Sequence, residues 1–141
     1  MHQKGIKLFL RLALSSAFLS AVADRFGFWS QDVSAWGNWG TFVHYVGILN
    51  PWAPHILITP FAIITTAAEV LFALCLLLGF KTRLFAVLSG ILLLLFALSM
   101  TFSTGIKTAF DASVYTASAG AFALSLIKVK FLEVDGLTTR K

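Results

Sequence analysis

The chain has 141 residues, of which 58% are hydrophobic and 12% are charged. Soluble domains are roughly 45–50% apolar and about 25% charged, so this composition excludes an ordinary soluble domain. The formal net charge of +5 needs no nucleic acid to explain it, because anionic lipid head groups attract basic residues at a membrane surface.

Four apolar stretches account for most of the chain and lie at about residues 6–23, 56–80, 83–103 and 108–127. Each reaches or approaches the roughly 17–25 residues that a helix needs to cross hydrocarbon. They lack the period-two alternation of barrel strands and are rich in Leu and Ala, which favour helix. The sequence therefore predicts an all-α fold, a transmembrane four-helix bundle in one domain of residues 1–128, with a cytoplasmic tail at residues 129–141.

The first apolar stretch also looks like a secretory signal, because Lys4 and Lys7 lie at its start and Ala21-Val22-Ala23, which resembles a small-residue cleavage site, lies at its end. Arg11 interrupts what would be the continuous apolar core of such a signal. We therefore expect the stretch to remain as the first span. Asp24 and Arg25, at its outer end, are expected to form a solvated rim.

The connection from residue 24 to residue 55 is rich in aromatic residues and contains all four tryptophans, which favour membrane interfaces. Apolar residues at three- and four-residue spacing from Trp39 to Val46 predict a short interfacial helix, which Asn50 and Pro51 end. His44 lies on this helix and is a candidate ligand-binding residue. A lone histidine among aromatic residues is more often a packing residue.

Glu69 lies in the middle of the second apolar stretch, with Thr65 and Thr66 one turn before it. An ionised carboxylate at mid-bilayer costs about 2.5–3.5 kcal/mol on insertion scales. Glu69 is therefore expected to face the bundle interior, where the two threonines can share its hydrogen bonds. Arg11, in the first span, is its expected partner. Such a pair is either a functional site, with Glu69 and Arg11 as catalytic residues, or only a device that fixes helix register.

The segment from Gly79 to Arg83 predicts a tight turn between the second and third spans, with Gly79 ending the helix. The two spans should therefore be antiparallel neighbours. Small residues such as Gly90 and Ala121 predict close helix contacts. The same pattern leaves a homo-oligomer open.

In the fourth stretch Asp111, Tyr115 and Ser118 fall on one face of an uninterrupted helix. They are candidate ligand-binding residues around a cavity that reaches Glu69. The alternative for Asp111 is a carboxylate in the first helical turn, stabilised by the helix dipole. No spacing of His, Asp or Glu predicts a metal site, and the single cysteine, Cys75, is expected to be an inert packing residue.

Lys and Arg in short loops collect on the cytoplasmic side of a membrane. Nine of the eleven basic residues fall on one side if both termini are inside, and only Arg25 and Lys107 fall on the other. The sequence therefore predicts cytoplasmic termini and an external aromatic connection.

Four features together resemble the DoxX family of small four-span membrane proteins. They are Arg11 in the first span, the mid-span Glu69, the run LLLGFKTR at residues 76–83 and the run SAGAFALSLI at residues 118–127. The resemblance covers about residues 6–128 and implies a four-helix bundle in the bacterial inner membrane. Some members of the family are subunits of oxidoreductase systems that pass electrons from sulfur compounds or thiols to quinone. Animal relatives resemble chaperones for receptor assembly.

Two functions follow from the resemblance and from the intramembrane charges. The first is a quinone-linked redox accessory subunit, in which Arg11 would bind the quinone, Glu69 would relay a proton, and a partner protein would supply electrons. The second is a non-enzymatic assembly factor or chaperone-like scaffold that binds another membrane protein. A small transporter is less favoured, because the sequence shows no inverted repeats.

Overall fold

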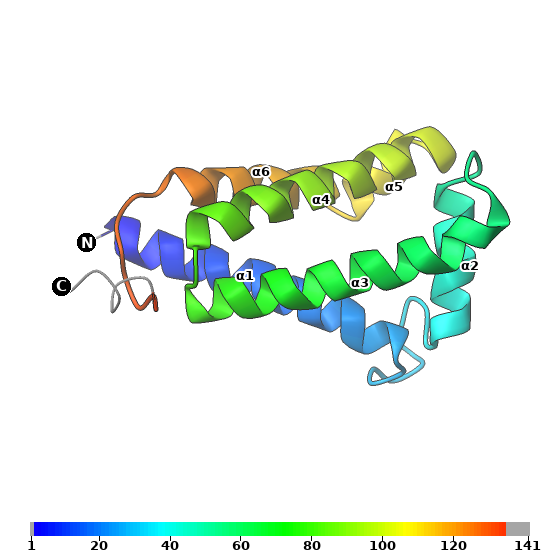
Figure 1. Cartoon of the computed structure of the whole chain (residues 1–141), viewed down its shortest axis with the longest axis horizontal. Coiled ribbons are helices and arrows are strands. Elements are labelled where there is room, and N and C mark those ends of the chain that lie inside the picture. Colours follow the sequence, from blue (N-terminus) through cyan, green and yellow to red (C-terminus); the bar gives the residue numbers. More distant parts are fainter. Residues whose placement is uncertain (1, 135–141) are drawn as a thin grey trace.

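The computed structural model describes residues 2–134, and all of their regular secondary structure is helical (Figure 1). The all-α prediction is therefore confirmed. The helices, in chain order, are α1 (His2–Arg25), α2 (Trp39–Leu49), α3 (His55–Leu78), α4 (Thr82–Ser103), α5 (Ile106–Asp111) and α6 (Val114–Leu126).

Three of these helices, α1, α3 and α4, are long and apolar enough to cross a membrane. Large apolar side chains of α3, such as Ile64 and Leu71, are exposed. Such exposure is unfavourable in water and favourable in contact with lipid. The apolar helix α6 has 13 residues and spans only about 20 Å at 1.5 Å per residue. By length and composition the chain is a multi-span helical membrane protein.

The uninterrupted fourth helix predicted for residues 108–127 is wrong, because the structure divides this stretch into α5 and α6. The break lies at Ala112 and Ser113, and Ser113 adopts the left-handed conformation with φ of 56°. The Ser113 amide binds the Phe110 carbonyl, three residues back, at 2.9 Å. Asp and Ser are weak helix formers whose side chains compete for backbone hydrogen bonds, and Asp111 and Ser113 lie at the end of α5.

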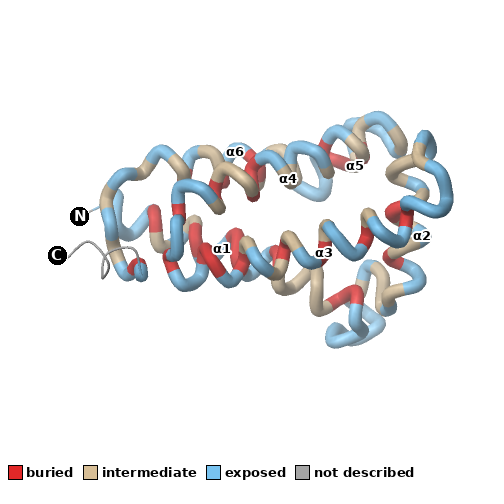
Figure 2. Tube along the Cα trace, viewed as in Figure 1, coloured by how far each residue is buried: buried red, intermediate tan, exposed pale blue. Residues whose placement is uncertain are grey.

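Four of the helices form two neighbouring pairs, α1 with α3 and α4 with α6, and α4 also contacts α3 (Figure 1). The N-terminal end of α1 and the chain segment after α6 lie at the same end of the bundle. The short helix α2 lies across the opposite end, against α3. Figure 2 shows that the buried positions lie mainly where the helices face one another.

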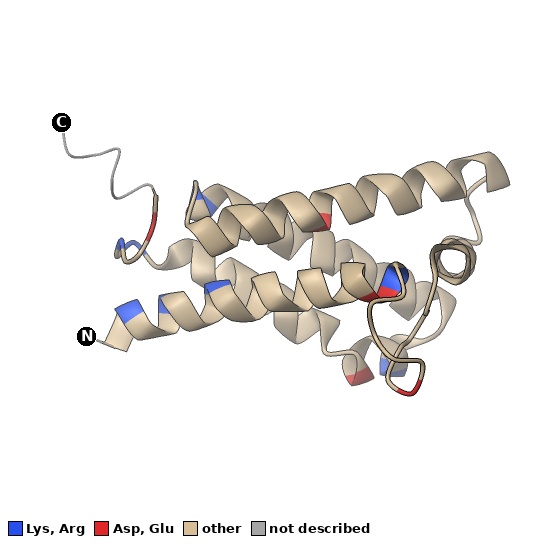
Figure 3. Ribbon diagram, turned by 90° about the horizontal axis from the view of Figure 1, so that it is seen from below, with Lys and Arg blue, Asp and Glu red and all other residues tan. Residues whose placement is uncertain are grey.

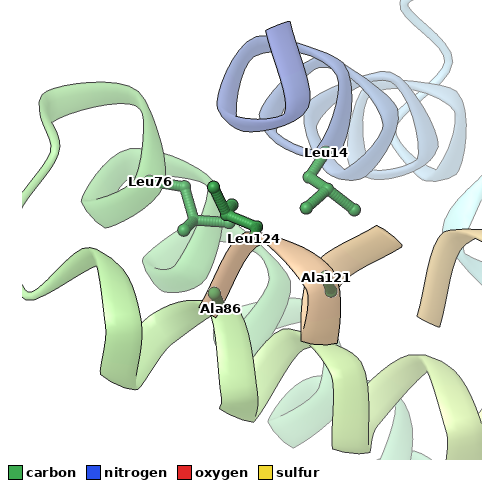
Figure 4. Close-up of a cluster of buried hydrophobic side chains, with 5 residues drawn as sticks. All are labelled: Leu14, Leu76, Ala86, Ala121 and Leu124. Atoms are coloured by element: carbon green, nitrogen blue, oxygen red, sulfur yellow. The ribbon is translucent and has the colours of Figure 1, made fainter. Parts of the chain in front are cut away.

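One buried apolar cluster joins all four of the paired helices (Figure 4). Its members are Leu14 from α1, Leu76 from α3, Ala86 from α4, and Ala121 and Leu124 from α6. The alanines let α4 and α6 approach closely, as predicted for small residues at helix contacts.

The contact between α4 and α6 is closest at Gly90. A Cβ atom at this position would lie 2.8 Å from the Phe122 ring. The Ser118 hydroxyl donates a hydrogen bond to the Gly90 carbonyl at 2.7 Å. Glycine is therefore required here by the neighbouring helix and not by its own backbone conformation.

The predicted turn between α3 and α4 is confirmed. Gly79 ends α3 in the left-handed conformation with φ of 70°. The Phe80 amide binds the Cys75 carbonyl at 2.8 Å and the Gly79 amide binds the Leu76 carbonyl at 3.2 Å. These two bonds form a Schellman motif, which satisfies carbonyls at the helix end and reverses the chain.

The predicted helix in the aromatic connection is also confirmed, as α2. The Asn38 side chain accepts a hydrogen bond from the Thr41 amide at 2.9 Å and caps the helix. Phe42 and Val46 are buried against Ile58 and Ala62 of α3. This apolar contact holds α2 over the end of the bundle.

Candidate functional site

Glu69 and Arg25 form a buried ion pair between α3 and the last residue of α1. Arg25 Nη2 donates to Glu69 Oε1 at 2.9 Å, and Arg25 Nη1 contacts Glu69 Oε2. Arg25 Nη1 also donates to the Thr66 hydroxyl at 2.7 Å. The two charged side chains are each 3% exposed. The expectation that Glu69 turns inward is therefore confirmed. Thr66 binds Arg25 rather than Glu69 itself, and the expected solvated rim at Arg25 is wrong.

The prediction that Arg11 pairs with Glu69 is wrong. Arg11 donates to the carbonyl oxygens of Leu76 and Leu77 at the C-terminal end of α3, at 2.8 and 2.9 Å. It also donates to the Phe131 and Leu132 carbonyls, each at 2.9 Å. The last carbonyls of a helix lack intrahelical partners and carry the negative end of the helix dipole. A cation at this position therefore satisfies backbone groups about two turns away from Glu69.

Aromatic rings cover the Arg25 guanidinium. Its central carbon lies 3.9 Å from the centre of the Phe42 ring and 5.4 Å from the Trp36 ring. The rings of Trp36 and Phe42 meet edge to face with centroids 5.2 Å apart. Cation–π attraction adds to the ion pair when the guanidinium is desolvated. The aromatic connection thus closes the site from the end of the bundle that holds α2.

Asp24, next to Arg25, binds the connection that carries Trp36. Its carboxylate accepts hydrogen bonds from the Ser34 hydroxyl, from the Ala35 amide at 2.8 Å and from the Trp36 amide at 3.2 Å. Asp24 is 6% exposed. Asp24 therefore holds residues 34–36 of the aromatic connection in place, whereas Arg25 binds Glu69.

The other predicted site residues do not gather around Glu69. The Thr65 hydroxyl donates to the Phe61 carbonyl of its own helix at 2.8 Å. The Tyr115 hydroxyl lies 2.9 Å from the Thr101 hydroxyl, and Ser118 binds Gly90 of α4. These two residues join α6 to α4 and thereby fix the pair of helices.

Asp111 and His44 lie on the surface. Asp111 forms an exposed ion pair with Lys107, one turn earlier on α5. His44 is exposed on α2. Within residues 2–134, no three His, Cys, Asp or Glu side chains lie close enough to hold a metal ion.

A second buried ion pair lies at the end of the bundle that holds the N-terminal end of α1. Lys7 Nζ lies 2.8 Å from Glu133 Oε1 and donates to the Val129 carbonyl at 2.7 Å. The Val134 amide binds the Leu78 carbonyl at 3.2 Å. Residues 129–134 of the predicted tail are therefore docked on α1 and α3. The remainder of the tail, 135–141, lies outside the described residues.

Cavities lie at both ends of the bundle. One, of about 260 Å³, lies at the end of the bundle that holds the buried Lys7 and Glu133. The other, of about 430 Å³, lies between α1 and the aromatic connection and is lined in part by Asp24, Trp29 and Trp36. Neither Glu69 nor Arg25 lines either cavity.

Comparisons of the chain with protein-family models, with curated proteins and with solved structures give no match.

Proposed function

We propose that the chain is a DoxX-like four-span protein of the bacterial inner membrane that acts without catalysis, as an assembly or stabilising subunit for another membrane protein. The fourth span in this proposal is the broken pair α5 and α6, whose combined length approaches that of the other spans. The DoxX resemblance rests on residues 6–128 of the sequence.

The observation that carries the proposal is that the buried charges Glu69, Arg25 and Arg11 are all held by groups of the protein itself. The Glu69 carboxylate is bound by Arg25, whose Nη1 also donates to the Thr66 hydroxyl. Arg11 is bound by four carbonyls. Charges held in this way fix the positions of helices, which is the best-attested use of buried ionic groups that bind no ligand.

A second candidate is the quinone-linked redox accessory subunit, and one feature favours it. Arg25 Nε is buried and has no hydrogen-bond acceptor among the described residues, so the guanidinium could still donate to a carbonyl oxygen. The cavity of about 430 Å³ reaches Asp24 and Trp36 beside it. In this reading Glu69 would exchange a proton with the reduced quinone, and a partner protein would supply the electrons.

The two candidates differ in whether a quinone binds at Arg25. The test is to purify the full chain, extract and identify any lipid-soluble chromophore, and measure thermal unfolding with and without added ubiquinone-1. Wild type, Arg25→Leu and Glu69→Gln are compared, with Lys107→Gln as an exposed control. The assembly proposal predicts no extracted quinone and the same small shift in all four proteins. Stabilisation of wild type and Lys107→Gln alone would contradict it and support the redox candidate.

The assembly proposal also requires a protein partner. A photo-crosslinking amino acid on the exposed face of α3, at Ile64 or Leu71, should give one discrete crosslinked protein in cell membranes. The same label at exposed Trp52 of the outer connection is the comparison. Crosslinking to lipid alone at every position would contradict the proposal.

A further inference from the structure

We propose that the cavity of about 260 Å³ at the end of the bundle that holds Lys7 and Glu133 binds the phosphate group of an anionic phospholipid. Four basic residues line it: Lys7 from α1, Arg83 from α4, and Lys128 and Lys130 from the segment after α6. In Figure 3 several ribbon positions coloured for Lys and Arg lie at this end of the bundle. The inference rests on the membrane location proposed above and is independent of whether the protein acts as an assembly factor or in redox chemistry.

Basic residues outnumber acidic residues in the lining of the cavity. Glu133 is the one carboxylate among the lining residues, and it is bound to Lys7 at 2.8 Å. Arg83 and Lys128 are exposed and have no acidic partner within residues 2–134. Arg83 and Lys128 are therefore available to an anion, and the arginine can bind two phosphate oxygens at once.

The N-terminal end of α4 reinforces this preference for an anion. The helix begins at Thr82, which lines the cavity together with Arg83. The residue before it, Lys81, provides no side-chain hydrogen bond that would cap the helix. The first turn of a helix carries amide groups without intrahelical acceptors and the positive end of the dipole, both of which favour phosphate.

The surroundings of the cavity favour a lipid over a soluble phosphate compound. Leu126 lines the cavity and is 75% exposed, and the exposed Leu84 lies one turn into α4. Acyl chains could therefore lie on apolar helix surfaces while the phosphate meets the cations. The volume is below the roughly 300–1,000 Å³ of sites that enclose a whole small ligand. It suits a head group whose lipid chains remain outside.

The experiment measures lipid binding to the purified full chain in detergent by native mass spectrometry. The probes are phosphatidylglycerol, phosphatidylcholine and the soluble compound glycerol 3-phosphate. The site variant is R83Q/K128Q. The control, K4Q/K107Q, removes the same net charge from two exposed residues that do not line the cavity. All four substitutions replace exposed side chains, so folding should be retained.

We expect wild type to bind phosphatidylglycerol in preference to phosphatidylcholine. The Kd should rise about tenfold or more in the site variant, because each cation near a lipid surface contributes appreciably to binding, and less than about twofold in the control. Equal losses in the two variants, or no preference for phosphatidylglycerol, would overturn the site. Binding of glycerol 3-phosphate as tight as that of phosphatidylglycerol would support the phosphate site but contradict its assignment to lipid.

Discussion

Arg11 joins two segments that are far apart in the sequence, the end of α3 and residues 131–132. Its guanidinium donates to carbonyl groups of both segments and is 1% exposed. A backbone carbonyl that loses its donor in a buried position costs about 1–3 kcal/mol. One side chain therefore stabilises the end of a membrane helix and the docked segment together.

Replacing Arg11 with Leu should lower the free energy of unfolding by more than about 2 kcal/mol and release the segment at residues 129–134, because several buried carbonyls lose their donor. Hydrogen exchange at Leu132 and Val134 measures the release. Arg11→Lys should have an intermediate effect, because an ammonium group can donate to fewer of the four carbonyls. Unchanged exchange in Arg11→Leu would show that the segment is held without this residue.

At the residue scale, the burial of Glu69 could be predicted and its partner could not. A carboxylate in an apolar helix must face the interior whatever the fold. Whether Arg11 or Arg25 binds Glu69 depends on how α1 is placed along α3. It also depends on the direction in which the Arg25 side chain leaves the end of α1. The carbonyl groups at the C-terminal end of α3 attract Arg11. The aromatic residues of the connection between α1 and α3 attract Arg25, because their rings bind a cation, and they are the sequence signal that could have identified it.

At the scale of the elements, the contact between α4 and α6 depends on the missing side chain at Gly90. A Cβ atom would contact the Phe122 ring at 2.8 Å. In contrast, a Cβ atom at Gly120 of α6 would lie 3.8 Å from the nearest atom, Leu10 Cδ2, which is an ordinary contact. Gly120 therefore serves as a control for Gly90, because both are helical glycines and only Gly90 lacks room for a Cβ atom.

Gly90→Ala should destabilise the protein by about 1–3 kcal/mol, because the Phe122 ring must move within a packed contact. Gly120→Ala should be neutral or stabilising by up to about 1 kcal/mol, because alanine favours helix more than glycine does. Chemical unfolding of the purified variants measures both. If the combination of Gly90→Ala with Phe122→Leu does not recover part of the loss, the collision with the ring is not its cause.

The helices with continuous apolar runs could be predicted to within a few residues, and the turn at Gly79 could be predicted from its glycine and the cations that follow it. The break at Ala112 and Ser113 could not, because no Pro or Gly marks it. The docking of residues 129–134 was also missed, since it depends on Lys7 and Arg11, which are distant in the sequence.

At the scale of the whole molecule, the distribution of charge divides the bundle into a basic end and an aromatic end. The described basic residues of the N-terminal segment, of the turn after α3 and of the segment after α6 lie at one end, opposite α2 (Figures 1 and 3). This arrangement supports the proposed topology, in which the basic end is cytoplasmic.

The topology can be measured with single cysteines in a Cys75→Ala background, since Cys75 is the one native cysteine and is buried. Lys4→Cys and Lys128→Cys should react with a membrane-impermeant maleimide only after the cells are opened. Lys107→Cys should react in intact cells. The positive-inside bias of the basic residues is the physical reason. Labelling of Lys4→Cys in intact cells would reverse the proposed orientation.

The central claim is that Arg25 and Glu69 form a closed pair that joins α1 to α3. A double-mutant cycle with Arg25→Leu and Glu69→Leu, measured by unfolding of the purified protein, tests it most directly. Each single substitution leaves a buried charge without its partner and should cost about 3–5 kcal/mol. The double substitution should cost much less than the sum of the two, because no unpaired charge remains. Additive losses would contradict the claim, because they would mean that the two side chains act independently.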